Sequence, residues 1–148
     1  MWYNKSLSAV NMFSFESYNR NFQNNELTVI FGQNLDNKKP RSNGSGKSAN
    51  LDLISLAITG EPLRADLKTI KDVIQNSFDK GSIELTVENI LLNKELKIVR
   101  TFSRKNDGGV EIWEKEKGSE FVLNKKLCDL HPKESVKYIL QLLEISKE

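Results

Sequence analysis

The chain has 148 residues, of which 38% are hydrophobic, and its 22 basic and 20 acidic side chains give a net charge of +2. This length and apolar content suffice for one compact domain with a real core and exclude a disordered chain. The near balance of charges excludes a bulk electrostatic attraction to nucleic acid, so any contact with DNA must be local.

Cysteine content and hydropathy bear on the compartment. The single cysteine, Cys128, excludes an internal disulfide, which fits a reducing compartment. The sequence contains no apolar run long enough to span a bilayer and no signal-peptide pattern. We therefore expect a cytoplasmic protein with no membrane partner.

The N-terminal part of the chain is predicted to form strands. Between residues 5 and 22, apolar residues alternate loosely with polar ones, which favours two short strands joined by a turn. A polar, turn-forming run at 23–26 follows. The continuous apolar segment 27–31 then predicts a strand that is buried on both faces.

The run at 43–48, Asn-Gly-Ser-Gly-Lys-Ser, indicates a chemistry. It is typical of a phosphate-binding loop, in which glycines let backbone N–H groups approach a triphosphate, a lysine meets the β- and γ-phosphates, and a hydroxyl ligates Mg²⁺. Lys47 and Ser48 fill the last two roles. Residues 49–59 are predicted to form a helix whose first-turn N–H groups and positive dipole end face the same phosphates.

This loop departs from the standard pattern. Arg41 stands where the pattern has its first glycine, Gly32 ends the preceding strand, and residues 33–42 lie between as an insertion. Because the insertion is rich in charged residues, we interpret it as a solvated surface loop. The alternative is an incidental turn that happens to be followed by Lys-Ser.

Two helices are predicted after the loop. The helix at 49–59 is apolar almost all round, so we expect it to be buried, and Gly60 and Pro62 are expected to end it. Residues 66–75 have apolar side chains at helical spacing and predict a short amphipathic helix.

The middle of the chain is predicted to be an antiparallel meander. From Gly81 the side chains alternate with a period of two, as in a strand with one wet face. Further strands are expected at 95–102, 110–114 and, more weakly, 121–123, with a hairpin turn at 106–109. After Pro132, an amphipathic helix places four apolar residues on one face: Val136, Ile139, Leu140 and Leu143.

Several of these segments resemble the N-terminal ATPase lobe of SMC-like ATPases of double-strand-break repair, the SbcC group. The similarity is greatest to its large-phage members, which serve as recombination endonuclease subunits. The resemblance is carried by residues 10–15, 32–36, 42–48, 56–64, 98–100 and 142–146, and so runs nearly end to end. The loop motif is shared with many ABC-type ATPases, whereas the interrupted loop and the helix-to-meander order point more narrowly to this group.

The resemblance implies an α/β fold, that of the N-terminal lobe of an ABC-type P-loop ATPase. It implies a mixed sheet with an antiparallel meander, the P-loop helix and a C-terminal amphipathic helix within residues 1–148. In this family a coiled coil separates the lobe from a C-terminal lobe that carries the signature motif and the acidic Walker B strand. The glutamine loop, acidic base and switch histidine are also outside this sequence, so we do not expect hydrolysis by this chain alone.

The implied function is ATP and Mg²⁺ binding in a head that a C-terminal lobe and a second copy complete. Such a head works with an SbcD-like nuclease subunit on DNA, in the cytoplasm of a bacterium or an infected bacterial host. Two alternatives stay open: a lobe of another SMC-like ATPase, in defence or chromosome organisation, and a stand-alone nucleotide-binding adaptor.

The predicted site has Lys47 as its catalytic residue and Ser48 as its metal ligand. The loop and helix contacts to the nucleotide are expected from Asn43, Gly44, Ser45, Gly46, Lys47, Ser48 and Ala49. Asn11 is added because residues 11–15 match the family's segment beside the base and sugar. Met12 and Phe13 replace the commoner aromatic-then-basic pair there, and filling the sheet explains these two side chains at least as well.

Other polar residues have competing interpretations. Asp52 is expected to form a salt bridge on the helix surface rather than to act as a catalytic base. His131 is expected to be a loop residue without a metal, and Trp113 to pack rather than to stack on a base. Six basic residues have two interpretations: they form a surface that contacts DNA phosphates, or they are ordinary solvated side chains. These residues are Arg64, Lys68, Lys71, Arg100, Arg104 and Lys105.

Overall fold

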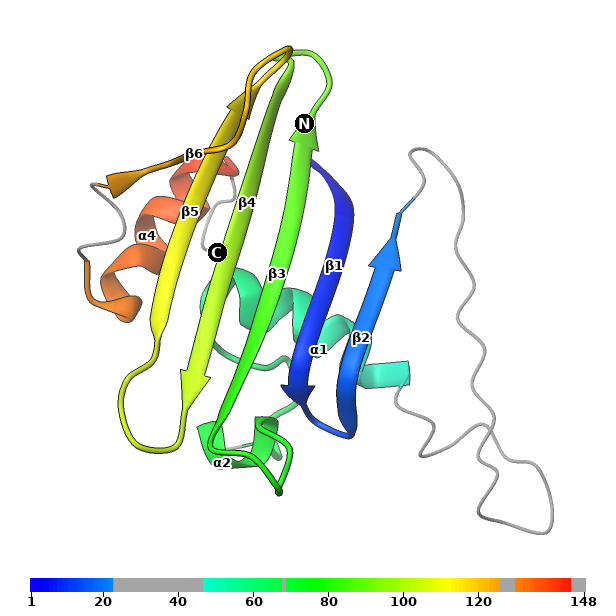
Figure 1. The fold of residues 1–148 in the computed structure, drawn as a ribbon, viewed down its shortest axis with the longest axis vertical. Helices are drawn as coiled ribbons and strands as arrows, with labels where there is room; N and C mark the ends of the chain where they lie inside the picture. Colours follow the sequence, from blue (N-terminus) through cyan, green and yellow to red (C-terminus); the bar gives the residue numbers. More distant parts are fainter. Residues whose placement is uncertain (23–46, 68, 126–129, 145–148) are drawn as a thin grey trace, which may run out of the picture.

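The computed structural model describes residues 1–22, 47–67, 69–125 and 130–144. The strands in this part of the chain form one sheet in the order β2-β1-β3-β4-β5-β6, and every neighbouring pair is antiparallel (Figure 1). The strands are β1 (Tyr3–Met12), β2 (Phe15–Asn21), β3 (Lys80–Asn89), β4 (Lys94–Ser103), β5 (Gly109–Glu116) and β6 (Val122–Leu123). The helices are α1 (Lys47–Thr59), α2 (Ile70–Val73) and α4 (Pro132–Leu142).

The predicted N-terminal strand pair is confirmed as β1 and β2. Their tight turn pairs Met12 with Phe15. Asn11 and Phe13 adopt positive φ angles of 55° and 54° in this turn, a conformation that is unusual for a bulky side chain. The Phe13 N–H donates to the Val73 carbonyl at 2.6 Å, so the last residue of α2 holds the turn in place.

The predicted antiparallel meander is also confirmed, as β3 to β6. The side-chain alternation buries Ile83 and Leu85 of β3, which are opposite Arg100 and Ile98 of β4. The predicted wet face of β3 is only partly wet, because Thr86 is 6% exposed between its neighbours on β1 and β4.

Helices α1 and α4 lie on the same face of the sheet (Figure 1). Helix α1 contacts β3, β4 and α4, and α4 also contacts β5. The core between these layers includes Leu53 and Leu56 from α1 and Ile139 from α4. Each such side chain stabilises the fold by about 1.5–3 kcal/mol on burial. The predicted amphipathic character of the last helix is thereby confirmed.

The prediction that α1 is buried all round is wrong. Leu51 is 59% exposed, whereas Asn50 and Asp52 are 7% and 1% exposed. The helix lies with one side against the sheet, and two polar residues reach that side because partners on other elements satisfy them. Gly60 does end α1 as predicted: it has φ +79° and donates its N–H to the Leu56 carbonyl at 2.9 Å.

The helix predicted over 66–75 is also shorter than expected, covering only α2. Thr69 caps it, with its N–H and hydroxyl donating to Asp72 Oδ2 at 2.8 and 2.9 Å. Beyond α2, Ile74 forms a β-bridge with Met12 and so leaves the helical conformation. The strand predicted at 27–31 lies outside the described residues. Within them, no helix is long and apolar enough to cross a bilayer.

Candidate functional site

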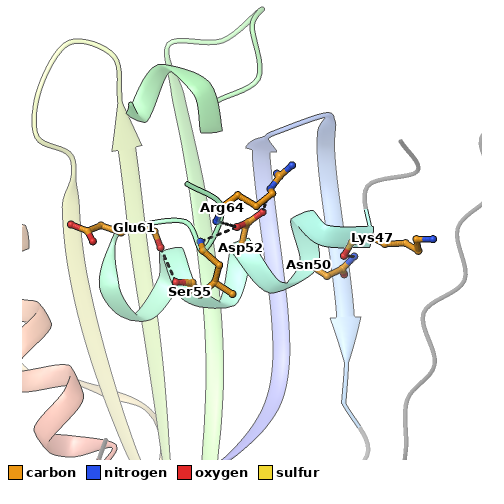
Figure 2. A network of polar contacts seen from close by, with 7 residues as sticks. Lys47, Asn50, Asp52, Ser55, Glu61 and Arg64 are labelled. Atoms are coloured by element: carbon orange, nitrogen blue, oxygen red, sulfur yellow. Dashed lines mark hydrogen bonds and ion pairs between the residues drawn. The ribbon is translucent and has the colours of Figure 1, made fainter. Parts of the chain in front are cut away.

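Lys47 and Ser48, the residues predicted to contact the phosphates and the metal, are the first two residues of α1. Lys47 is half-buried and Ser48 is exposed, so the hydroxyl of Ser48 is accessible at the first turn. Figure 2 shows the Lys47 side chain pointing away from the other labelled residues. Ala49 is 5% exposed and packs inward, which leaves its backbone N–H as the group it can offer a ligand. The remaining predicted loop contacts, Asn43, Gly44, Ser45 and Gly46, lie outside the described residues, as does the insertion 33–42.

A side-chain link joins the first turn of α1 to strand β2. The Tyr18 hydroxyl donates to Asn50 Oδ1, and Asn50 Nδ2 donates to the Lys47 carbonyl at 3.3 Å. The ring of Phe15 packs against the ring of Tyr18, with 5.0 Å between the two ring centroids. Sequence analysis missed both Tyr18 and Asn50. The available signal was a polar residue on the inner side of an otherwise apolar helix, and a buried amide needs a partner.

Asp52 forms a salt bridge, but a buried one rather than the predicted surface pair. Its Oδ2 lies 2.5 Å from Arg64 Nε, and its Oδ1 accepts the N–H groups of Leu63 and Arg64 at 2.9 and 3.2 Å (Figure 2). With both oxygens engaged in this way, Asp52 is a structural clamp on the segment that follows α1. The geometry therefore agrees with the expectation that Asp52 is not the catalytic base.

The turn that contains Asn11 is connected to this clamp. The guanidinium carbon of Arg64 lies 5.5 Å from the ring centroid of Phe13, so Phe13, Arg64 and Asp52 form a chain from the β1–β2 turn to α1. Asn11 itself contacts other elements: its Nδ2 donates to the Lys80 carbonyl at 3.4 Å, and its carbonyl accepts the Gln75 N–H. Met12 is fully buried, which confirms the packing interpretation for this residue.

The basic surface weighed for DNA phosphates does not include Arg100. The prediction is wrong for Arg100, which is 3% exposed and donates to the carbonyls of Ala57 and Ile58 at 3.1 and 3.2 Å. The negative end of the α1 dipole attracts this guanidinium inward, and burial lowers the pKa of Arg100 to about 10.

The other described members of the basic set also have intramolecular partners. Arg64 pairs with Asp52, and Lys105 Nζ lies 2.5 Å from Asp79 Oδ2. Arg104 donates to two backbone carbonyls in the segment between α2 and β3, those of Ile74 and Phe78. The side chains of Lys68 and Lys71 lie outside the described set.

His131 and Trp113 have local structural roles. His131 is the N-cap of α4, where its Nδ1 accepts the Lys133 N–H at 3.3 Å, so it is more than the loop residue that was expected. The Trp113 ring lies 5.3 Å from Lys97 Nζ, which is a cation–π contact across the sheet. Among the described residues, no three His, Cys, Asp or Glu side chains gather as a metal site.

A cleft of about 620 Å³ lies at the opposite end of α1 from Lys47. Its walls come from the C-terminal turn of α1, the β4–β5 hairpin and α4, and include Thr59, Arg100, Asp107 and Lys137. Because it adjoins the last turn of α1 rather than the first, this cleft is separate from the predicted phosphate site.

Comparisons with known proteins agree with this architecture. A family model described as an AAA domain matches residues 6–148, and the chain therefore belongs to this AAA-domain family. Two solved structures of the recombination mediator protein RecF, described as RecF-ATP and RecF-ATPrS in the RecFOR pathway, share its fold with TM-scores of 0.56 and 0.53. Both are 16% identical and cover 75% of this chain.

The chain spans only about a quarter of those RecF structures, 27% and 26% of their lengths. The fold class predicted from the sequence, an α/β lobe of an ABC-type P-loop ATPase, is confirmed by this similarity and by the family. A comparison with curated protein sequences found no match.

Proposed function

We propose that residues 1–148 form the ATP-binding, N-terminal lobe of an SMC-like ATPase that acts in DNA repair or recombination. The observation that carries this proposal is the position of Lys47 and Ser48. They open a helix that lies against the sheet, at the place in the chain where a phosphate-binding sequence ends. Membership of the AAA-domain family and the likeness to RecF-ATP support it.

The residues present suit a Mg²⁺–triphosphate. The Lys47 ammonium group would neutralise charge on the phosphates, and the exposed Ser48 hydroxyl would hold the Mg²⁺. When bound, Mg²⁺ would supply positive charge that offsets the negative charge of the phosphates. The N–H groups of the first turn of α1 and its positive dipole end would add favourable contacts to the same anion.

Hydrolysis needs groups that the described residues do not provide. Asp52, the carboxylate on the same helix as Lys47, is 1% exposed and is engaged by Arg64 and two backbone amides. It cannot also orient a water molecule. We therefore assign this chain a binding role and place the catalytic base on a C-terminal lobe and a second copy that complete the head.

The finer assignment rests on sequence resemblance. The interrupted loop at 32–48 and the helix-to-meander order support an SbcC-type ATPase of the large-phage kind, with an SbcD-like nuclease subunit and DNA as partners. Co-purification of the complete head with a metal-dependent nuclease subunit would support this assignment. A complete head that handles DNA with no such subunit would favour another SMC-like machine.

Titration of the full chain with Mg-ATP tests the binding role directly. We expect Lys47→Ala to weaken ATP binding strongly, and Lys133→Ala, an exposed lysine on α4, to leave it unchanged. Ser48→Ala should weaken binding in Mg²⁺ but not in EDTA, because only the metal-dependent contact is removed. Equal affinity of the wild type and Lys47→Ala would refute the proposed function.

A further inference from the structure

We propose that Tyr18 is a positioning residue for nucleotide binding, acting through Asn50 on the first turn of α1. This inference rests on the proposed ATP-binding function. Its physical basis is the two-bond relay in which the Tyr18 hydroxyl donates to Asn50 and the Asn50 amide donates to the Lys47 carbonyl. The relay ends on the backbone of the residue whose ammonium group is expected to meet the phosphates.

The relay matters because the two ends of α1 are held differently. In the C-terminal half, Leu53, Leu56 and Ala57 pack in the core. Arg100 also donates hydrogen bonds to the carbonyls near the end of the helix. At the N-terminal turn, Lys47 is half-buried, Ser48 is exposed and the small Ala49 packs inward, so apolar packing fixes this turn less tightly than the C-terminal half. The described contacts that tie this turn to the sheet therefore include a polar one, from β2.

Tyr18 is itself well placed to serve as an anchor. It is paired in register with Ala9 of β1, and its ring lies against Phe15 with an interplanar angle of 40°. An aromatic ring packed in this way loses little further entropy when its hydroxyl makes a hydrogen bond. The strand thus sets the position of Asn50, which is 7% exposed.

The functional consequence concerns preorganisation. A phosphate site built from backbone N–H groups binds best when these groups already point at the anion, because the ligand then does not have to order the turn. Without the Tyr18 hydroxyl, Asn50 would lose its link to strand β2 and the first turn would sample more conformations. We expect the affinity for ATP to fall by about fivefold, the factor that corresponds to one net hydrogen bond.

The test compares Tyr18→Phe with the wild type in Mg-ATP titrations of the full chain, well below the melting temperature. Tyr18→Phe keeps the ring packing and removes only the hydroxyl. Tyr138→Phe, a change at a 43% exposed tyrosine on α4, is the matched control and should bind as the wild type does. A purely structural role for Tyr18 would lower the melting temperature and leave the affinity of the folded protein unchanged.

A double-mutant cycle shows whether the effect passes through Asn50. Asn50→Leu should weaken binding to a similar extent, and adding Tyr18→Phe to it should weaken binding no further. Unchanged affinity in Tyr18→Phe, with binding lost in Lys47→Ala, would overturn the inference and leave the proposed function standing. Unchanged affinity in Lys47→Ala would overturn both. If Asn50→Leu does not fold, the Tyr18→Phe titration decides alone.

Discussion

Asp52 and Arg64 are twelve residues apart in the chain, yet Asp52 Oδ2 lies 2.5 Å from Arg64 Nε. The two side chains differ in environment, since that of Asp52 is 1% exposed and that of Arg64 is 39% exposed. The same carboxylate accepts the backbone N–H groups of Leu63 and Arg64. One buried anion therefore fixes the direction in which the chain leaves α1.

Removing this anion should cost more stability than removing a surface charge. We expect Asp52→Ala to lower the free energy of unfolding by about 3 kcal/mol, because two backbone amides and a guanidinium lose their acceptor together. Asp66→Ala, at an exposed carboxylate close by, should change it by less than about 0.5 kcal/mol. Urea denaturation at pH 7 measures both. Equal losses in the two variants would contradict the clamp.

Arg100 should stabilise the end of α1 through its two carbonyl contacts. We expect Arg100→Met to lower the free energy of unfolding by about 2 kcal/mol, the loss of charged hydrogen bonds being partly offset by relief of desolvation. Arg20→Met, at a cation–π contact with Phe22 on the edge strand, should cost about 1 kcal/mol or less. Similar losses would argue against a special role for Arg100.

The pH dependence of the Arg100→Met effect has a definite sign. Burial lowers the folded-state pKa of Arg100 to about 10, below its ordinary value, so the charged form is penalised in the folded protein. The penalty is present at every pH below 10 and is relieved as the pH rises above it. Relative to Arg100→Met, the wild type should keep a constant stability from pH 6 to 9 and gain stability above pH 10. A difference that changes between pH 6 and 9 would show that another group titrates with it.

The sequence predicted the parts of this molecule that repeat a local pattern. Strict alternation located β3 and β4 to within a residue or two, and Gly60 marked the end of α1. The environment of Arg100 could not be read in the same way, because it depends on β4 approaching the end of α1, a contact across more than forty residues.

The candidate site shows the same division. The sequence predicts a chemistry for it, because Lys47 and Ser48 belong to a recognisable loop motif. The contact between Tyr18 and Asn50 beside this site could not be predicted, because the two residues are 32 residues apart in the chain and neither belongs to a motif. The burial of Asp52 was missed for a related reason. The helical pattern gives the spacing of side chains along α1, but it does not show that Arg64 pairs with Asp52.

The ion pair between Asp79 and Lys105 provides an independent test of electrostatics by pH. The Lys105 ammonium group, by hydrogen bond and by charge, holds the pKa of Asp79 below its usual range. Lys105→Gln should therefore raise the pKa of Asp79 toward its ordinary value, as NMR titration of the carboxyl group would show. Because the pKa is depressed in the folded state, the pair stabilises the protein above the unfolded-state pKa. This contribution is lost as the pH falls through the folded-state pKa.

The control for this titration is Lys117→Gln, at a lysine on the β5–β6 turn, which should leave the pKa of Asp79 where it is. Both residues of the Asp79–Lys105 pair are exposed, so the effect should also shrink as salt is added. An unchanged pKa in Lys105→Gln would mean that the two side chains do not meet in solution.

Two adjacent glycines in the β4–β5 hairpin should respond very differently to alanine. Gly108 has φ +73°, and a Cβ atom there would lie 2.0 Å from the Thr101 carbonyl oxygen, whereas a Cβ on Gly109 would have no atom within 4 Å. Gly108→Ala combines a strained backbone with a clash against main chain, so we expect a loss of about 3 kcal/mol or more. Gly109→Ala should be close to neutral. Urea denaturation of the pair measures the difference, and the opposite ranking would show that the hairpin turns at another residue.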